Sequence, residues 1–304
     1  MKVIIAGGTG FLGGELTKHF SSKGDEVIVL TRSEKPPTDS ARYVQWNGRM
    51  IDSWVEELEG SELLINLTGK SVDCRYTEKN KTEIMRSRVD ATTILGRAIE
   101  QAIIPPRLWI NASTATIYRY STDQEMDEYT GEIGSDFSMS VANAWEEALY
   151  RSHTPKTRKV ALRISLVLGE SGGVYPVFKR LAKFGVAGKM GSGKQRFAWI
   201  HIKDVLRIVD FIHEKENLEG AVNCTAPDVP TNAEFLRLFR NSLGVSIGIP
   251  QPKWLLKIGA ILIGTESELI LKSRWVIPLK LKDEGFVFKF DTPEKALNDL
   301  AKKV

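Results

Sequence analysis

The sequence predicts an α/β protein with a Rossmann-like, doubly wound parallel sheet and a small, mainly helical C-terminal subdomain. Two observations lead to this prediction. Short β-branched runs alternate with longer amphipathic stretches from the start of the chain, which is typical of successive βαβ units. After about residue 225 this alternation ends, and helical stretches follow one another.

The predicted strands are nearly continuous apolar runs, as expected for a parallel sheet that is buried on both faces. The clearest helix between them covers residues 81–102, where apolar side chains recur at helical spacing. Pro105 and Pro106 then stop that helix before the next strand. The strands are expected within residues 2–7, 26–32, 41–46, 62–69, 107–114 and 159–169.

The C-terminal part contains three helical stretches and one strand candidate. The apolar run FVFKF at residues 286–290 predicts a short strand. The helical stretches cover residues 231–244, 252–264 and 267–285.

Composition argues against several classes of protein. The 304 residues are 42% apolar and 26% charged, as in an ordinary globular protein. The formal charge of +4 is spread along the chain, so we expect no nucleic-acid partner. Residues 254–264 are too short to span a bilayer, and we expect a cytoplasmic protein without membrane association. Cys74 and Cys224 are isolated and the four histidines lack ligand spacing, so no disulfide framework or metal site is expected.

The most informative stretch is the glycine-rich segment after the first predicted strand. It fits GxGxxG, or GxxGxxG when Gly7 replaces Gly8. Such glycines allow a tight turn, a close approach of backbone to a pyrophosphate, and close packing of the following helix. The free N–H groups of that helix favour phosphate. The expected cofactor-binding residues here are Gly7, Gly10, Phe11, Leu12 and Gly13.

The end of the second predicted strand distinguishes two dinucleotides. A carboxylate at this place would bind the adenosine ribose 2′-hydroxyl of NAD. The chain has Thr31, Arg32 and Ser33 instead, and a guanidinium suits a 2′-phosphate. We therefore predict NADP(H), with Thr31 and Arg32 at its adenosine end.

Several further segments, in their order and spacing, resemble the extended short-chain dehydrogenase/reductase superfamily. They are GGTGFLGG, LTRS, INLTGKSVDCRYTEKNKTEIMRSRVDAT, NASTATIY, ALRISLVLG, GSGKQRFAWIHIKDV and the tail that ends in LKDEGFVF. More closely, the chain looks like the epimerase-like branch with a small C-terminal domain of unknown function.

This resemblance implies an NADP-binding domain over residues 1–225 and a substrate-side cap over residues 226–304. Residues 170–200 would contribute to the substrate side of the cleft between them. The family does not define a substrate, and we expect a small polar molecule that is sugar-like or anionic; a homodimer remains open. Leu67, Thr68 and Gly69 are expected to border the cofactor.

Members of the superfamily place a Ser or Thr after the fifth strand, and then a Tyr and a Lys one helical turn apart. The cation lowers the pKa of the Tyr, which otherwise lies near ~10. Thr114 matches the catalytic hydroxyl, and Ser113 beside it is expected to contact the cofactor. Tyr118, a few residues further on, is a candidate proton donor.

The Tyr–Lys dyad itself is missing. Counting on from Thr114 without a gap brings Met139 and Asn143 to its two positions. A shift of one residue brings Ser138 and Ala142 there instead. Neither register contains Tyr or Lys, although Asn143 could still hydrogen-bond a cofactor ribose.

Other charged residues are weighed as substrate ligands against ordinary surface roles. Arg75 and Arg88 suit an anionic substrate, or they belong to ion pairs on helix surfaces. Glu146 and Glu147 could substitute for the missing dyad, but they are expected instead to face solvent or to cap neighbouring groups. His201 and Asp204 are expected to be structural. Gln195 and Arg196 are candidate ligands of a substrate phosphate or carboxylate.

Tyr175 and Lys179 form the single Tyr-x-x-x-Lys of the chain, but they follow the sixth predicted strand rather than the fifth. Pro176 favours the first helical position, which would leave Tyr175 at the cap, outside the helix. We therefore expect Tyr175 to line the substrate mouth rather than to form a catalytic dyad.

Two functions fit these observations. One is an NADP(H)-dependent oxidoreductase or epimerase in which Thr114 orients the substrate oxygen. The other is a non-catalytic NADP(H)-binding sensor or scaffold, which the missing dyad favours.

Overall fold

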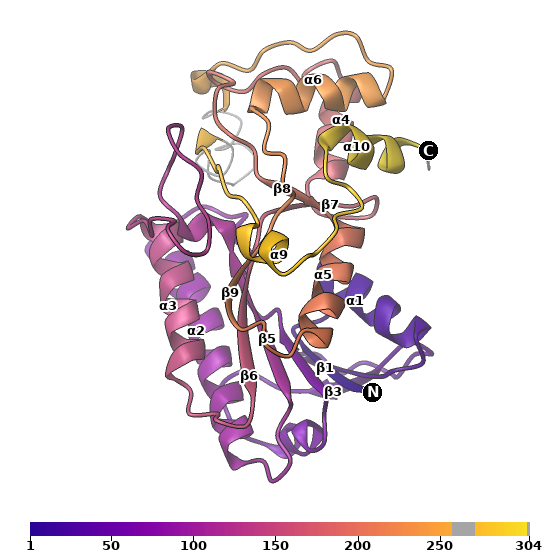
Figure 1. Ribbon diagram of the computed structural model, residues 1–304, viewed down its shortest axis with the longest axis vertical. Coiled ribbons are helices and arrows are strands. Elements are labelled where there is room, and N and C mark those ends of the chain that lie inside the picture. The colour runs from indigo at the N-terminus through magenta and orange to yellow at the C-terminus, as the bar shows by residue number, and fades with distance from the viewer. Residues whose placement is uncertain (257–270, 303–304) are drawn as a thin grey trace.

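The computed structural model describes residues 1–256 and 271–302 of the chain. Its centre is a seven-stranded parallel sheet with the strand order β3-β2-β1-β4-β5-β6-β9 (Figure 1). The order reverses between β1 and β4, and the carboxyl ends beside such a reversal are the usual position of a ligand. The predicted Rossmann-like sheet is confirmed. The strands are β1 (Lys2–Ala6), β2 (Glu26–Thr31), β3 (Arg42–Gln45), β4 (Leu63–Asn66), β5 (Leu108–Thr114), β6 (Arg158–Ile164) and β9 (Gly220–Cys224).

Helices cover both faces of this sheet, because its strands are apolar on both sides. In β1, Val3 and Ile5 belong to the apolar cluster under α1 and α5. Ile4 and Ala6 point the other way, into the cluster under α2. The bounds of these helices are α1 (Phe11–Ser22), α2 (Glu78–Gln101), α3 (Phe137–Arg151) and α5 (Ile202–Glu214), and a short helix η1 (Ser53–Leu58) follows β3.

A second layer lies beyond the carboxyl edge of the sheet (Figure 1). Aromatic side chains pack together inside it. The rings of Phe197 and Phe235 stack with their centroids 4.2 Å apart. Phe178 packs against both of them and against Phe239. This layer contains the two-stranded sheet of β7 (Leu166–Leu168) and β8 (Trp199–His201), with α4 (Tyr175–Lys183), α6 (Asn232–Ser242) and α10 (Pro293–Ala301); α9 (Leu279–Asp283) lies beside β9.

The strand predicted at residues 286–290 does not form. The N–H groups of Lys289 and Phe290 donate instead to the buried carboxylate of Asp204, at 3.1 and 2.8 Å. A side chain of α5 thus satisfies backbone groups that a sheet would otherwise pair.

Two further predictions changed in detail. The single strand expected over residues 159–169 is divided into β6 and β7 at Ser165, whose N–H donates to the Cys224 carbonyl at 3.1 Å. Tyr175 is the first helical residue of α4 rather than its cap, which is Val174. Most of the helix predicted at residues 252–264 lies outside the described residues.

The turn from β1 into α1 depends on two glycines. Gly7 has φ +73°, and a β-carbon there would lie 2.9 Å from the Cα of Thr68. A β-carbon on Gly13 would lie 2.4 Å from the backbone of Gly8, so only glycine allows α1 to pack this closely on the turn. Gly10 caps the helix with open space around it.

We predict that Gly13→Ala lowers the free energy of unfolding by roughly 1–3 kcal/mol, because the added methyl group overpacks this contact. Gly14→Ala is the matched control on the same helix, since a β-carbon there meets nothing within 4 Å. It should raise stability by about 0.5–1 kcal/mol through helix propensity. Urea unfolding measures both variants. Equal stability of the two would contradict the packing argument.

Candidate functional site

A cleft of about 700 Å³ runs along the carboxyl ends of β1, β2 and β4. Gly7 and Gly10 line it from the turn before α1. Gly10 is the N-cap residue of α1 and has no side chain that could accept a hydrogen bond from the first N–H groups of the helix. The N–H groups at the start of α1 are therefore available to an anion. The expected contacts Thr31, Arg32, Leu67, Thr68 and Gly69 all line this cleft.

The cleft fits a dinucleotide that carries a 2′-phosphate. Arg32 is exposed directly after β2, and Arg49 lines the same end of the cleft. Arg49 approaches Asp90 at 3.8 Å, a weak contact that leaves the guanidinium accessible. Thr31 is the last residue of β2, so no carboxylate stands where a 2′-hydroxyl would be bound.

Phe11 and Leu12 lie in the first turn of α1. Phe11 is enclosed by glycines of the loop that follows β7, because β-carbons on Gly169 or Gly172 would lie 2.3 Å from its ring. The glycine-rich segment at residues 169–173 therefore packs onto the first turn of α1.

A second, smaller pocket of about 200 Å³ lies at the carboxyl end of β5. Thr114, the predicted catalytic hydroxyl, lines this pocket. Its side chain accepts a hydrogen bond from the N–H of Thr116 at 3.1 Å, which fixes its rotamer and leaves its proton free to donate. The other lining residues are Val72, Tyr76, Ile84, Arg88, Ser113, Thr116, Phe137, Ser138, Val141, Ala142, Trp145 and Ile164.

The structure distinguishes the two registers considered for the missing dyad. Ser138 and Ala142 line the pocket. Met139 is buried against the loop at Gly134 instead, and Asn143 is exposed on the outer face of α3. The expected contact between Asn143 and the cofactor is therefore not supported by its position.

Trp145 also lines the pocket, and the sequence patterns above did not predict this. Its spacing of seven residues from Ser138 places both residues on one face of the helix. Its indole N–H donates to Thr92 Oγ1 at 3.0 Å, and Thr92 also accepts from Asn66 at 3.1 Å. These buried bonds hold the indole against the pocket. Trp145 in turn lies 5.0 Å from the guanidinium of Arg88.

A buried ion pair forms beneath Ser113. Arg163 of β6 donates two hydrogen bonds to Glu146 of α3, at 2.8 and 2.7 Å, and Ser113 donates a third at 2.6 Å. The expectation that Glu146 faces solvent is wrong, since its exposed fraction is 5%. Ser113 therefore contributes its hydroxyl proton to this network, while Glu147 next to it is paired on the surface with Arg151.

Tyr118 extends the network away from the pocket. Its hydroxyl accepts from Arg163 at 2.7 Å and donates to Asn223 at 3.0 Å. Burial raises the pKa of Tyr118 to about 12. The side chain is fully buried and does not line the pocket, so its position argues against the expected role as proton donor.

The remaining substrate candidates lie apart from the small pocket. Tyr175 is fully buried and packs on Phe239, with ring centroids 5.3 Å apart. Gln195 is buried and donates to the Met190 carbonyl at 2.8 Å. Arg196 stacks on Trp275 and donates to the Val229 carbonyl, and Arg75 is exposed; none of these four lines the pocket.

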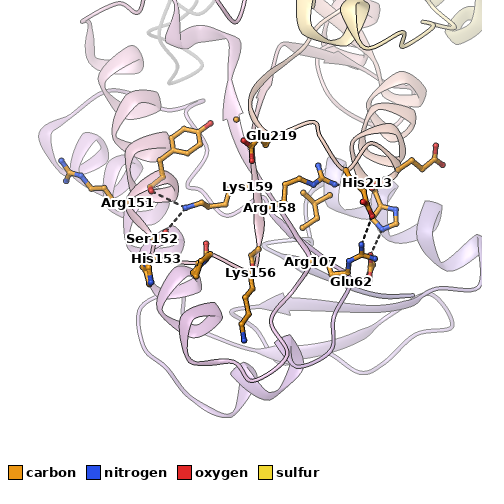
Figure 2. Close-up of a pocket in the computed structure, with 18 residues that line it drawn as sticks. Glu62, Arg107, Arg151, Ser152, His153, Lys156, Arg158, Lys159, His213 and Glu219 are labelled. Atoms are coloured by element: carbon orange, nitrogen blue, oxygen red, sulfur yellow. Dashed lines mark hydrogen bonds and ion pairs between the residues drawn. The ribbon is translucent and has the colours of Figure 1, made fainter.

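Another hollow, of about 1070 Å³, lies at the opposite, amino-terminal edge of the sheet (Figure 2). Several of its cations are already paired: Arg107 with Glu62 and Glu216, and Arg151 with Glu147. Lys159 donates to the Ser152 carbonyl at the end of α3, and Arg158 to the Leu218 and Ile212 carbonyls. In this part of the hollow, cations therefore bind carbonyl groups at helix ends.

Two further findings concern the described residues. They contain no cluster of three or more His, Cys, Asp or Glu that could hold a metal ion. None of their helices is long and apolar enough to cross a membrane.

The parallel sheet, the glycine-rich turn and the cleft beside it define a dinucleotide-binding protein of the Rossmann type. The chain belongs to the NAD dependent epimerase/dehydratase family, whose model matches residues 3–224. A second model, a domain of unknown function called DUF1731, matches residues 251–300.

Similar proteins cover the chain from end to end. Epimerase family protein SDR39U1 of Mus musculus is 31% identical over 306 residues, with 99% of each chain covered. Epimerase family protein YfhF of Bacillus subtilis is 31% identical over 303 residues, covering 99% of this chain and 98% of its own. The crystal structure of human SDR39U1 with NADPH has a TM-score of 0.89 at 30% identity, with both chains fully covered. A UDP-N-acetylglucosamine 4-epimerase of Bacillus cereus, at 18% identity and TM-score 0.78, shares the fold.

We predict that Glu146→Gln lowers the free energy of unfolding by roughly 3–5 kcal/mol, because Arg163 then becomes a buried, uncompensated charge. Glu147→Gln makes the same change on an exposed ion pair one residue away and should cost at most about 0.5 kcal/mol. Chemical denaturation of the two variants gives the comparison. A similar loss of stability in both variants would show that the buried pair contributes no more to the free energy of unfolding than the exposed pair.

Proposed function

We propose that this protein is an NADP(H)-dependent oxidoreductase that reduces a carbonyl compound in the small pocket beside Thr114. The observation that carries the proposal is the arrangement of two cavities at the carboxyl edge of one sheet. The larger has the glycine-rich turn and Arg32. The smaller presents a positioned hydroxyl. The NADPH bound to the similar human protein supports the choice of cofactor.

In this proposal the bound nicotinamide supplies a hydride, and the protein orients the acceptor. Thr114 donates its hydroxyl proton as a hydrogen bond to the carbonyl oxygen, which polarises the carbonyl and stabilises the negative charge that develops there. The oxygen then takes a proton from water, because Tyr118 is enclosed in the buried network. The product is an alcohol.

A second candidate is a non-catalytic NADP(H) sensor. The observation that favours it is the presence of Ser138 and Ala142 on the pocket face, where related enzymes carry their Tyr and Lys. The test measures NADPH binding, and then NADPH oxidation in the presence of a panel of aldehydes, ketones and oxo acids. Binding without oxidation by any of these compounds would favour the sensor.

For the cofactor, we predict that Arg32→Ala weakens NADPH binding roughly 10- to 100-fold and leaves NADH binding unchanged. The reason is the loss of one charge-assisted contact to the 2′-phosphate. Arg97→Ala removes an exposed arginine further along α2 and is the control. Fluorescence titration of both nucleotides measures the effect. If the preference for NADPH survives in Arg32→Ala, the assignment of Arg32 is wrong.

For catalysis, we predict that Thr114→Val lowers kcat for NADPH-dependent carbonyl reduction by about 10²-fold or more, because a preorganised donor to the developing charge is lost. The dissociation constant of NADPH should not change. Valine keeps the shape and the β-branch of threonine. Full activity in this variant would remove Thr114 from the mechanism.

A further inference from the structure

Among the described residues, one charged side chain lines the small pocket, Arg88 of α2. Its Nη1 donates to the Lys70 and Ile84 carbonyls at 2.9 and 3.0 Å. Within residues 1–256 and 271–302, no carboxylate is paired with it. Its neighbours Arg86 and Lys70, by contrast, pair with Asp90 and Glu83.

The surroundings of Arg88 make its charge, which has no carboxylate partner, energetically unfavourable. The guanidinium lies over the ring of Trp145, and Gly69 packs so closely that a β-carbon there would lie 2.8 Å from Cζ. Burial lowers the pKa of Arg88 to about 10. Arg88 is half-buried, and a half-buried cation without a carboxylate partner is stabilised by any anion that can reach it.

The walls of the pocket restrict what such an anion can be. Apart from Arg88 and hydroxyl groups, the lining is aliphatic or aromatic, with Phe137, Val141 and Trp145 on the α3 side. Its volume of about 200 Å³ is below the usual range for drug-sized ligands, roughly 300–1,000 Å³. A nucleotide sugar is too large and too polar for these walls.

We propose that the pocket binds a compact oxo acid: a molecule with an aromatic or branched aliphatic body, one carboxylate for Arg88, and one carbonyl for Thr114. The inference rests on the proposed oxidoreductase function for the fate of the carbonyl. Hydride from NADPH adds to the carbonyl carbon and a proton from water adds to its oxygen. An oxo acid and NADPH thereby become a hydroxy acid and NADP⁺.

Binding of two unreactive probes of nearly equal shape tests this. Calorimetric titration of the NADPH-saturated protein compares phenylacetate with phenylacetamide. We expect phenylacetate to bind roughly 10- to 100-fold more tightly, as for a hydrogen-bonded charge. Arg88→Met, which keeps much of the aliphatic stem, should abolish this preference. Arg88→Lys should retain part of it. Arg86→Met, two residues earlier on the same helix and exposed, is the matched control and should behave as the wild type.

NADPH affinity, measured on every variant, separates the possible outcomes. Equal binding of the two probes to the wild type overturns the proposal, as does a preference that persists in Arg88→Met. A tenfold loss of NADPH affinity in Arg88→Met also overturns it, because Arg88 would then serve the cofactor. A preference that depends on Arg88, without NADPH oxidation by oxo acids, aldehydes or ketones, upholds the anion pocket and instead refutes the oxidoreductase function.

Discussion

The buried pair of Glu146 and Arg163 is the constraint on which the site depends. It lies where β5, α3 and β6 meet, and its hydrogen bonds fix the distances between these elements. Removing either charge would leave the other in a medium of low dielectric constant, so both are needed together. The position of α3, and with it one wall of the small pocket, follows from this contact.

The same network extends from the sheet to the C-terminal part. The hydroxyl of Tyr118 connects Arg163 to Asn223. The side-chain amide of Asn223 then donates to the Ile277 carbonyl at 2.9 Å. The Asn223 N–H donates to Glu128 at 2.8 Å. These polar groups are thus used to join strands of the sheet to the C-terminal part of the chain, whereas Thr114 lines the small pocket.

Patterns with a short range could be predicted from the sequence, and contacts between distant segments could not. The alternating strands and helices and the glycine turn depend on local periodicity and spacing, and the structure contains both. The register of α3 depends on where its cap forms: Asp136 accepts from the Met139 N–H, which turns Ser138 rather than Met139 toward the pocket. Tyr175 is buried because Phe239, far along the chain, covers it. From the sequence alone, Glu146 is expected at the surface, because its partner Arg163 lies on a different element and the pairing depends on the fold.

The two cavities differ in chemistry although they are neighbours. The cleft that we assign to the cofactor includes the glycine-rich turn, which suits a ligand shared by many proteins of this fold. The small pocket is built from side chains, so its specificity can differ between proteins of one family. Gly69 lines the first cavity, and its missing side chain leaves room for Arg88 of the second. A larger residue at this position would push the guanidinium out of its place over Trp145, so one glycine keeps the two cavities both adjacent and distinct.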